Sequence, residues 1–263
     1  SSCAFYRPSS IQNPFLRQKG DIQVGGSMGS TFDANLAYSP AEHFFINAGL
    51  GRASSVSRKT NDSISPTMET KFRNFQYHLS LGCFDTIISD HLRIQAAIGY
   101  GVGESGGVRL TVDPAVILLF PFAYADNGIY GASYENLFGQ FSLHQATKNQ
   151  LLFGLLYKLN YLNIDAIDYF NKNGNTADFS LRSRAQWVHQ VAIEFIKERK
   201  NIGTFFQLQF AFAEPYSKIV TVRNTGFHFG LYLKLNELFA KPSRKEKRKS
   251  SKPFYDEQYR SHW

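Results

Sequence analysis

The chain has 263 residues, a formal net charge of +8, 43% hydrophobic residues and only 19% charged residues. Soluble domains carry nearer a quarter charged residues, so this composition is poor in charge for a protein surrounded by water. The longest apolar stretch, residues 114–125, is too short for a helical membrane span, and Pro121 interrupts it. The positive charge comes with no zinc-ligand spacing and no helical recognition element, so we expect no nucleic-acid partner.

Alternation of apolar with polar or small residues is the most persistent pattern in the chain. Between residues 226 and 232, for example, Phe227, Phe229 and Leu231 alternate with small, polar or amphipathic residues. A period of two predicts a strand with one face in an apolar medium. The pattern predicts ten strands, at residues 20–29, 31–39, 43–53, 72–84, 91–103, 134–146, 150–162, 186–199, 203–214 and 224–238.

Strand length and the character of the second face predict a membrane barrel rather than a sandwich. Most predicted strands reach the roughly 9 to 11 residues that cross a bilayer at a tilt. The second face is mainly Gly, Ala, Ser, Asn and Gln, which is typical of a narrow polar lumen. Short and long connections alternate along most of the chain, as in outer-membrane barrels. We predict an all-β fold, a closed antiparallel up-and-down transmembrane β-barrel of about ten strands; an extra strand pair within residues 104–133 would make twelve.

Three parts follow from this prediction. Residues 1–19 are expected to be an N-terminal periplasmic segment, residues 20–239 the transmembrane barrel, and residues 240–263 a basic periplasmic tail with an aromatic end. An even strand count places both chain ends in the periplasm, below the outer membrane of a Gram-negative bacterium. Seven polar residues are expected to line the lumen: Gln76, His78, Arg93, Lys158, Glu194, His228 and Lys234.

The first residues, Ser1-Ser2-Cys3, resemble the end of a bacterial lipobox, with two small residues before a cysteine. No complete signal peptide is visible, so we expect a processing site close to this point. Cleavage before Cys3 would make it a lipidated first residue; the alternative is a free or disulfide-bonded cysteine.

The first fifty residues also carry a family resemblance. From Cys3 to Gly51 the chain is similar to a group of small outer-membrane barrel lipoproteins of Bacteroidota to which no activity is assigned. The resemblance implies an outer-membrane barrel and supplies no catalytic residue. The matching residues are Tyr6-Arg7-Pro8, Asn13-Pro14-Phe15-Leu16, Lys19-Gly20-Asp21, Ala37-Tyr38-Ser39-Pro40 and His43.

Two segments are candidates for binding a protein partner. The apolar stretch in the long connection would be a contact site if it is exposed, or else a lid over the barrel or two extra strands. The tail joins a basic linker to an aromatic end that is typical of a docking peptide, or else is a solvated tail. The residues concerned are Pro114, Ile117, Leu118, Phe120, Phe122, Lys245, Arg248, Phe254, Tyr255, Tyr259 and Trp263.

These features favour a structural or accessory subunit of a larger outer-membrane complex. A small solute channel is the first alternative and an outer-membrane enzyme the second. We find no catalytic constellation or metal-ligand spacing, and expect no catalytic residue, metal or cofactor. The expected partners are outer-membrane lipid and proteins of an envelope complex, with lipopolysaccharide and peptidoglycan as further candidates.

Overall fold

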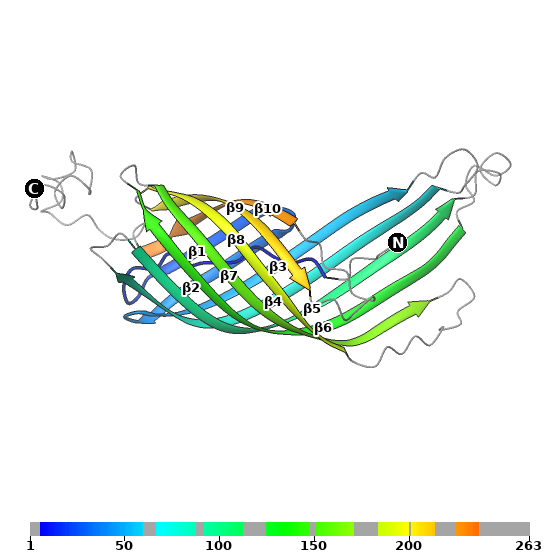
Figure 1. Ribbon diagram of the computed structural model, residues 1–263, viewed down its shortest axis with the longest axis horizontal. Helices are drawn as coiled ribbons and strands as arrows, with labels where there is room; N and C mark the ends of the chain where they lie inside the picture. Colours follow the sequence, from blue (N-terminus) through cyan, green and yellow to red (C-terminus); the bar gives the residue numbers. More distant parts are fainter. Residues whose placement is uncertain are drawn as a thin grey trace, which may run out of the picture.

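A computed structural model of the chain describes residues 6–59, 67–87, 92–112, 125–147, 151–170, 184–199, 201–213 and 225–236. These residues form ten strands (Figure 1). The strands are β1 (Ile22–Gly29), β2 (Phe32–Ala41), β3 (Phe44–Lys59), β4 (Thr67–Ile87), β5 (Leu92–Val112), β6 (Ala125–Ala146), β7 (Leu151–Phe170), β8 (Arg184–Arg199), β9 (Ile202–Ala213) and β10 (Thr225–Lys234).

The ten strands close into one antiparallel barrel. Each strand pairs with its neighbours in sequence, and β1 pairs with β10 from Gln23↔Lys234 to Gly29↔His228 to complete the cylinder. The predicted fold class is therefore confirmed, with ten strands. Residues 104–112 and 125–133, where an extra strand pair was an alternative, instead lengthen β5 and β6.

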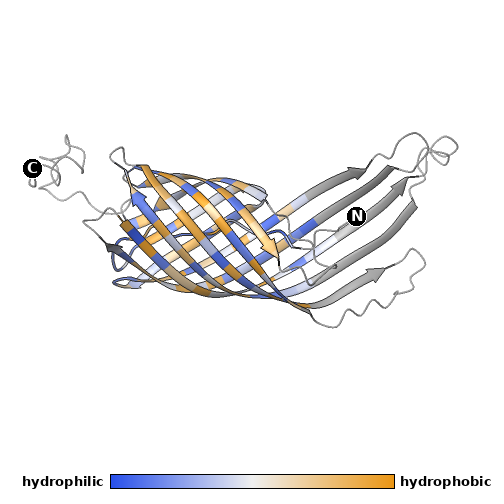
Figure 2. Cartoon of the chain, viewed as in Figure 1, coloured by the Kyte–Doolittle hydropathy of each residue, from blue (hydrophilic) through white to orange (hydrophobic). Residues whose placement is uncertain are grey.

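The outer wall is apolar. In β4, Leu79 and Leu81 are 55% and 54% exposed, whereas Ser80 between them is 4% exposed. The same alternation runs along the strands around the barrel (Figure 2). A continuous exposed apolar surface is unstable in water and is stable against acyl chains, so this wall spans a membrane. No helix among the described residues is long and apolar enough to cross a membrane.

The apolar belt ends at a recognisable row of residues. Phe75 pairs with Arg52 on one side and with Glu104 on the other, and both charged residues are exposed. Elsewhere on the outer wall, Tyr161 packs against Trp187 with ring centroids 4.9 Å apart.

The two ends of the barrel differ. At the short-turn end, brief connections join β2 to β3, β4 to β5, β6 to β7 and β8 to β9. At the opposite, long-hairpin end, β3 to β7 continue well past the row of Arg52 and Glu104, whereas β1 stops at Gly29 (Figure 1). The wall is thus tall on one side, where β4, β5 and β6 have 21, 21 and 22 residues, and low on the other, where β1 has 8.

Candidate functional site: a lumen filled by the N-terminal segment

Residues 6–17 run through the inside of the barrel, and we call them the strap. Tyr6, Ile11, Phe15 and Leu16 are each 3% exposed or less, although they precede the first strand. The strap lies inside the ring of strands (Figure 1) and reaches from the long-hairpin end to the short-turn end. The predicted location of residues 1–19 in the periplasm therefore fails for residues 6–17.

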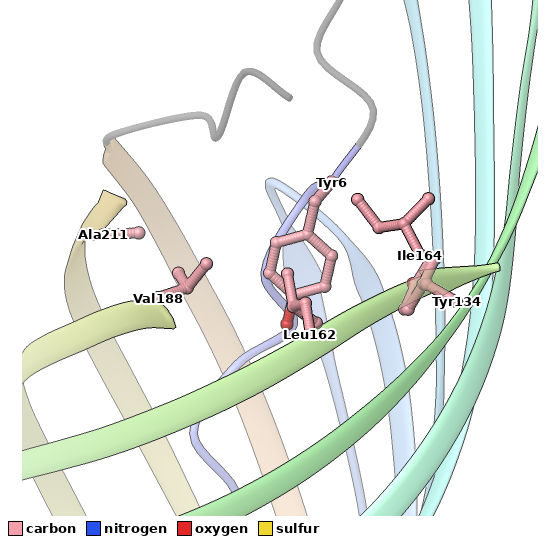
Figure 3. Packing of buried hydrophobic residues seen from close by; sticks show 6 residues of the cluster. All are labelled: Tyr6, Tyr134, Leu162, Ile164, Val188 and Ala211. Carbon is pink, nitrogen blue, oxygen red and sulfur yellow. The ribbon is translucent and has the colours of Figure 1, made fainter. Parts of the chain in front are cut away.

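The upper end of the strap is held by an aromatic contact. Tyr6 projects among side chains of β6, β7, β8 and β9 near the long-hairpin end (Figure 3). Its ring meets that of Tyr134 edge to face, with centroids 5.4 Å apart. Arg7, the next residue, donates a hydrogen bond to the main-chain oxygen of Ser54 at 3.4 Å.

The middle of the strap is bound through its main chain. The side chain of Gln207 makes two bonds to Ile11, accepting from its N–H and donating to its carbonyl oxygen, both at 3.0 Å. Asp33 accepts from the N–H of Ser10 at 3.1 Å. Because these wall groups bind the peptide backbone, they replace the hydrogen bonds that an extended chain would otherwise make to water.

The lower half of the strap is bound in the same way. Gln23 accepts from the N–H of Phe15 at 2.7 Å, and Gln95 donates to the carbonyl oxygen of Pro14 at 2.6 Å. The Arg93 guanidinium donates to the carbonyl oxygen of Leu16 at 2.6 Å and lies 5.1 Å from the centre of the Phe15 ring.

An ionic contact closes the short-turn end. Arg17 lies 3.1 Å from the Glu198 carboxylate, which also binds Lys234. A turn then follows, in which Asp21 accepts hydrogen bonds from two strap-side N–H groups and Gly20 adopts a positive φ of 87°. This left-handed residue reverses the chain into β1, so the strap and the first strand run in opposite directions.

The predicted periplasmic chain ends lie outside the described residues, but the first and last described residues can be placed. An even number of strands does place the start of β1 and the end of β10 at the same, short-turn end. The strap, however, folds back through the lumen, so Tyr6 lies at the long-hairpin end. The first and last described residues, Tyr6 and Asn236, are thus at opposite ends of the barrel.

Polar residues of the wall form two buried clusters beside the strap. In the first, Asp33 lies 3.4 Å from the His228 ring nitrogen and accepts from Thr31 at 2.8 Å. In the second, Glu194 lies 3.0 Å from His144. The strap covers both clusters, and among the described residues neither presents a nucleophile to an open cleft.

All seven residues predicted to line the lumen project from the inward face of their strands. Arg93 donates a hydrogen bond to the strap, and Glu194 belongs to one of the clusters beside it. Lys234 binds Glu198 at the short-turn end of the strap. Gln76 accepts a bond from Tyr134, and Lys158 lies 3.9 Å from the centre of the Phe138 ring, whose edge meets His78.

A small cavity lies beside the strap. It has a volume of about 20 Å³ and lies between Ser10, Ile11, Asp33 and Glu194. A cavity of that size holds about one water molecule. The predicted partner-binding residues, from Pro114 to Phe122 and from Lys245 to Trp263, and the predicted lipidation site Cys3 lie outside the described residues.

No family model matches the chain, and neither does any curated protein sequence. Solved structures that resemble it include an autotransporter translocator domain and two porins. The translocator domain of the autotransporter NalP from Neisseria meningitidis is 12% identical, with a TM-score of 0.41 over 81% of this chain and 86% of that one. The KdgM porin is 9% identical with a TM-score of 0.27, and the NanC porin 10% identical with 0.26, each covering 81% of this chain and 98% of the porin.

Proposed function

We propose that the chain is an outer-membrane β-barrel of a Gram-negative bacterium that serves as a structural or accessory subunit of an envelope complex. The observation that carries the proposal is the filled lumen. A channel needs a continuous hydrated path, and here the buried strap runs through the barrel and is bonded to its wall. The apolar outer wall supports the membrane location.

The tall side of the barrel offers a surface for a protein partner. Past Arg52, the described part of β3 pairs with β4 alone, and past Ile164 the described part of β7 pairs with β6 alone. Unpaired strand edges present N–H and carbonyl groups that another chain can bind as an added strand. The apolar stretch at residues 114–122 and the basic, aromatic tail remain predicted contact segments of the same subunit.

An enzyme is less well supported. The His228 ring touches Asp33 and Thr31, but its other nitrogen is buried without a partner among the described residues. A general base must reach the proton it removes, and here both side chains are buried, with Asp33 bonded to the strap at Ser10. We therefore propose no catalytic residue.

Two measurements test the proposal. The full-length protein, reconstituted in a planar bilayer, should show no steady conductance, and a steady conductance would favour the channel. Affinity purification from detergent-solubilised membranes should recover a stoichiometric protein partner. Recovery of the barrel alone would contradict the accessory role.

The contact segments can be tested in the same purification. Removal of residues 243–263 should weaken the association while the barrel itself remains folded. A variant with serine at Ile117, Leu118 and Phe120 tests the apolar stretch separately. A partner that binds both variants as tightly as the intact chain would exclude these two segments as its contact sites.

Lipidation of Cys3 is a separate part of the proposal. The mature protein should carry a covalent lipid on this residue, detectable as added mass on the N-terminal peptide. A Cys3→Ser variant should lose that mass but still assemble in the membrane, because the barrel wall alone holds the chain in lipid.

A further inference from the structure

The wall of the lumen is built to bind an extended peptide. Six side chains from five strands of the wall bond to main-chain atoms of the strap, so recognition depends on the backbone more than on strap side chains. These side chains are Asp33, Gln23, Gln95, Arg93, Gln140 and Gln207.

Side-chain pockets add selectivity at three points. Ile11 packs with Leu156 and Ala192, Phe15 stacks on Tyr232 with centroids 5.6 Å apart, and Leu16 joins a separate cluster near the short-turn end. Burial of these apolar side chains adds to the main-chain bonds.

We propose that the lumen is a binding site for an extended peptide, that the strap is its resident ligand, and that release of the strap opens a polar pore. This inference concerns the lumen alone and goes beyond the accessory role. Apart from the main chain that continues through residues 18–21 into β1, the described contacts of the strap with the wall are hydrogen bonds, ion pairs and apolar contacts, which are individually weak and reversible.

The lumen without the strap would be polar and easily hydrated. The inward face carries the buried amides, the Asp33 and Glu194 carboxylates and the Arg93 and Lys158 side chains. Several of these groups already have polar atoms without a partner among the described residues, including Asp33 Oδ1 and Gln76 Nε2. Such groups favour water over an apolar filling, because unpaired buried polar atoms are costly.

The first arm of the test weakens the binding of the strap without touching the strap itself. The variant Gln23→Leu, Gln95→Leu, Gln207→Leu keeps side-chain size but removes four hydrogen bonds to the strap main chain. In planar bilayers we expect its open fraction to exceed that of the intact protein by about tenfold or more.

A matched control removes a buried amide bond that does not involve the strap. Asn136 donates to Asn160 at 3.1 Å, a contact between β6 and β7. The variant Asn136→Leu should remain as closed as the intact protein. Heat-modifiable migration in gels shows for each variant whether the barrel has folded.

The second arm locks the strap in place. The hydroxyl oxygens of Ser10 in the strap and Ser27 in β1 are 3.3 Å apart and buried. The changes Ser10→Cys and Ser27→Cys, made with Cys3→Ser and Cys83→Ser, allow a disulfide between strap and wall. When added to the triple leucine variant, this disulfide should abolish the openings, and its reduction should restore them.

A third arm supplies the ligand from outside. A synthetic peptide of residues 6–17 should shorten the openings of the triple leucine variant, and a peptide with serine in place of Ile11, Phe15 and Leu16 should do so at least about tenfold less effectively. The proposal is overturned if the folded triple variant stays as closed as the intact protein, or if the locked and reduced forms conduct equally. Either result would leave the accessory role untouched. A steady conductance of the intact protein, in contrast, would contradict the accessory role itself.

Discussion

At the scale of single residues, glycines on the inner face make room for aromatic rings. A Cβ added at Gly99 would lie 2.3 Å from the Phe138 ring and 2.7 Å from the carbonyl oxygen of Leu79. A Cβ added at Gly203 would likewise lie too close to the Tyr232 ring. The sequence predicts small inward residues, but the rings that cover them come from neighbouring strands, so the pairing is visible only once the register is known.

Gly99→Ala should therefore destabilise the barrel. We expect a loss of about 1–3 kcal/mol, because the Phe138 ring and the backbone of β4 must both shift. Gly139→Ala is the matched control, since nothing lies within 4 Å of a Cβ at that position. The measurement is the urea midpoint for loss of heat-modifiable migration, and equal midpoints for the two variants would contradict the packing described.

Glu194 supports a second prediction at this scale. Its carboxylate binds His144 at 3.0 Å and accepts a hydrogen bond from Gln207 at 3.3 Å, so it also orients the glutamine that holds Ile11. Glu194→Ala should cost about 1–3 kcal/mol, because it leaves buried polar groups unpaired. Glu194→Gln keeps an acceptor oxygen and should cost less. The urea midpoint measures both effects. An alanine variant as stable as the glutamine variant would contradict a stabilising role of the Glu194 contacts.

At the scale of elements, the sequence predicts the strands well where one of their faces contacts lipid. All ten predicted strands exist, because one face touching acyl chains imposes a strict alternation. The prediction ends β3 at residue 53 and β5 at residue 103, whereas the strands reach Lys59 and Val112. Beyond the row of Arg52 and Glu104 the wall leaves the apolar belt, so the alternation fades although the strand pairing continues.

The strap is the element that the sequence does not show. An extended peptide enclosed by a barrel contacts the wall on several sides, so its side chains follow no period of two. Its partners are also remote in the chain: Ile11 and Gln207 are 196 residues apart. The only sequence signals are Tyr6, Ile11, Phe15 and Leu16, apolar residues that a segment in water would have little reason to carry.

The apolar belt makes a prediction for the strands. Leu79 lies midway along the outward face of β4 between the charged row and the short-turn end, so Leu79→Arg should cost about 2–4 kcal/mol. Ser54→Arg places the same side chain on β3 beyond the belt and should cost much less. Refolding yields into lipid vesicles and urea midpoints measure both effects. Similar losses at the two positions would mean that the belt is wrongly placed.

At the scale of the whole molecule, the strap turns a hollow cylinder into a filled one. The barrel wall, the polar lumen and the inward position of seven residues follow from sequence alternation. Whether that lumen is open does not, because it depends on where the twelve residues of the strap lie, from Tyr6 to Arg17. The functional difference between a channel and a closed subunit thus rests on a segment with no periodic signal of its own.

The most direct test of the filled lumen is a cross-link between strap and wall in the assembled protein. With Cys3 and Cys83 replaced by serine, the pair Ser10→Cys and Ser27→Cys should form an intramolecular disulfide in nearly every folded molecule, because the two hydroxyl oxygens lie 3.3 Å apart inside the barrel. Peptide mapping by mass spectrometry should recover residues 10 and 27 joined. Free thiols at both positions in a folded, heat-modifiable barrel would show that the strap lies outside the lumen, and would contradict this account.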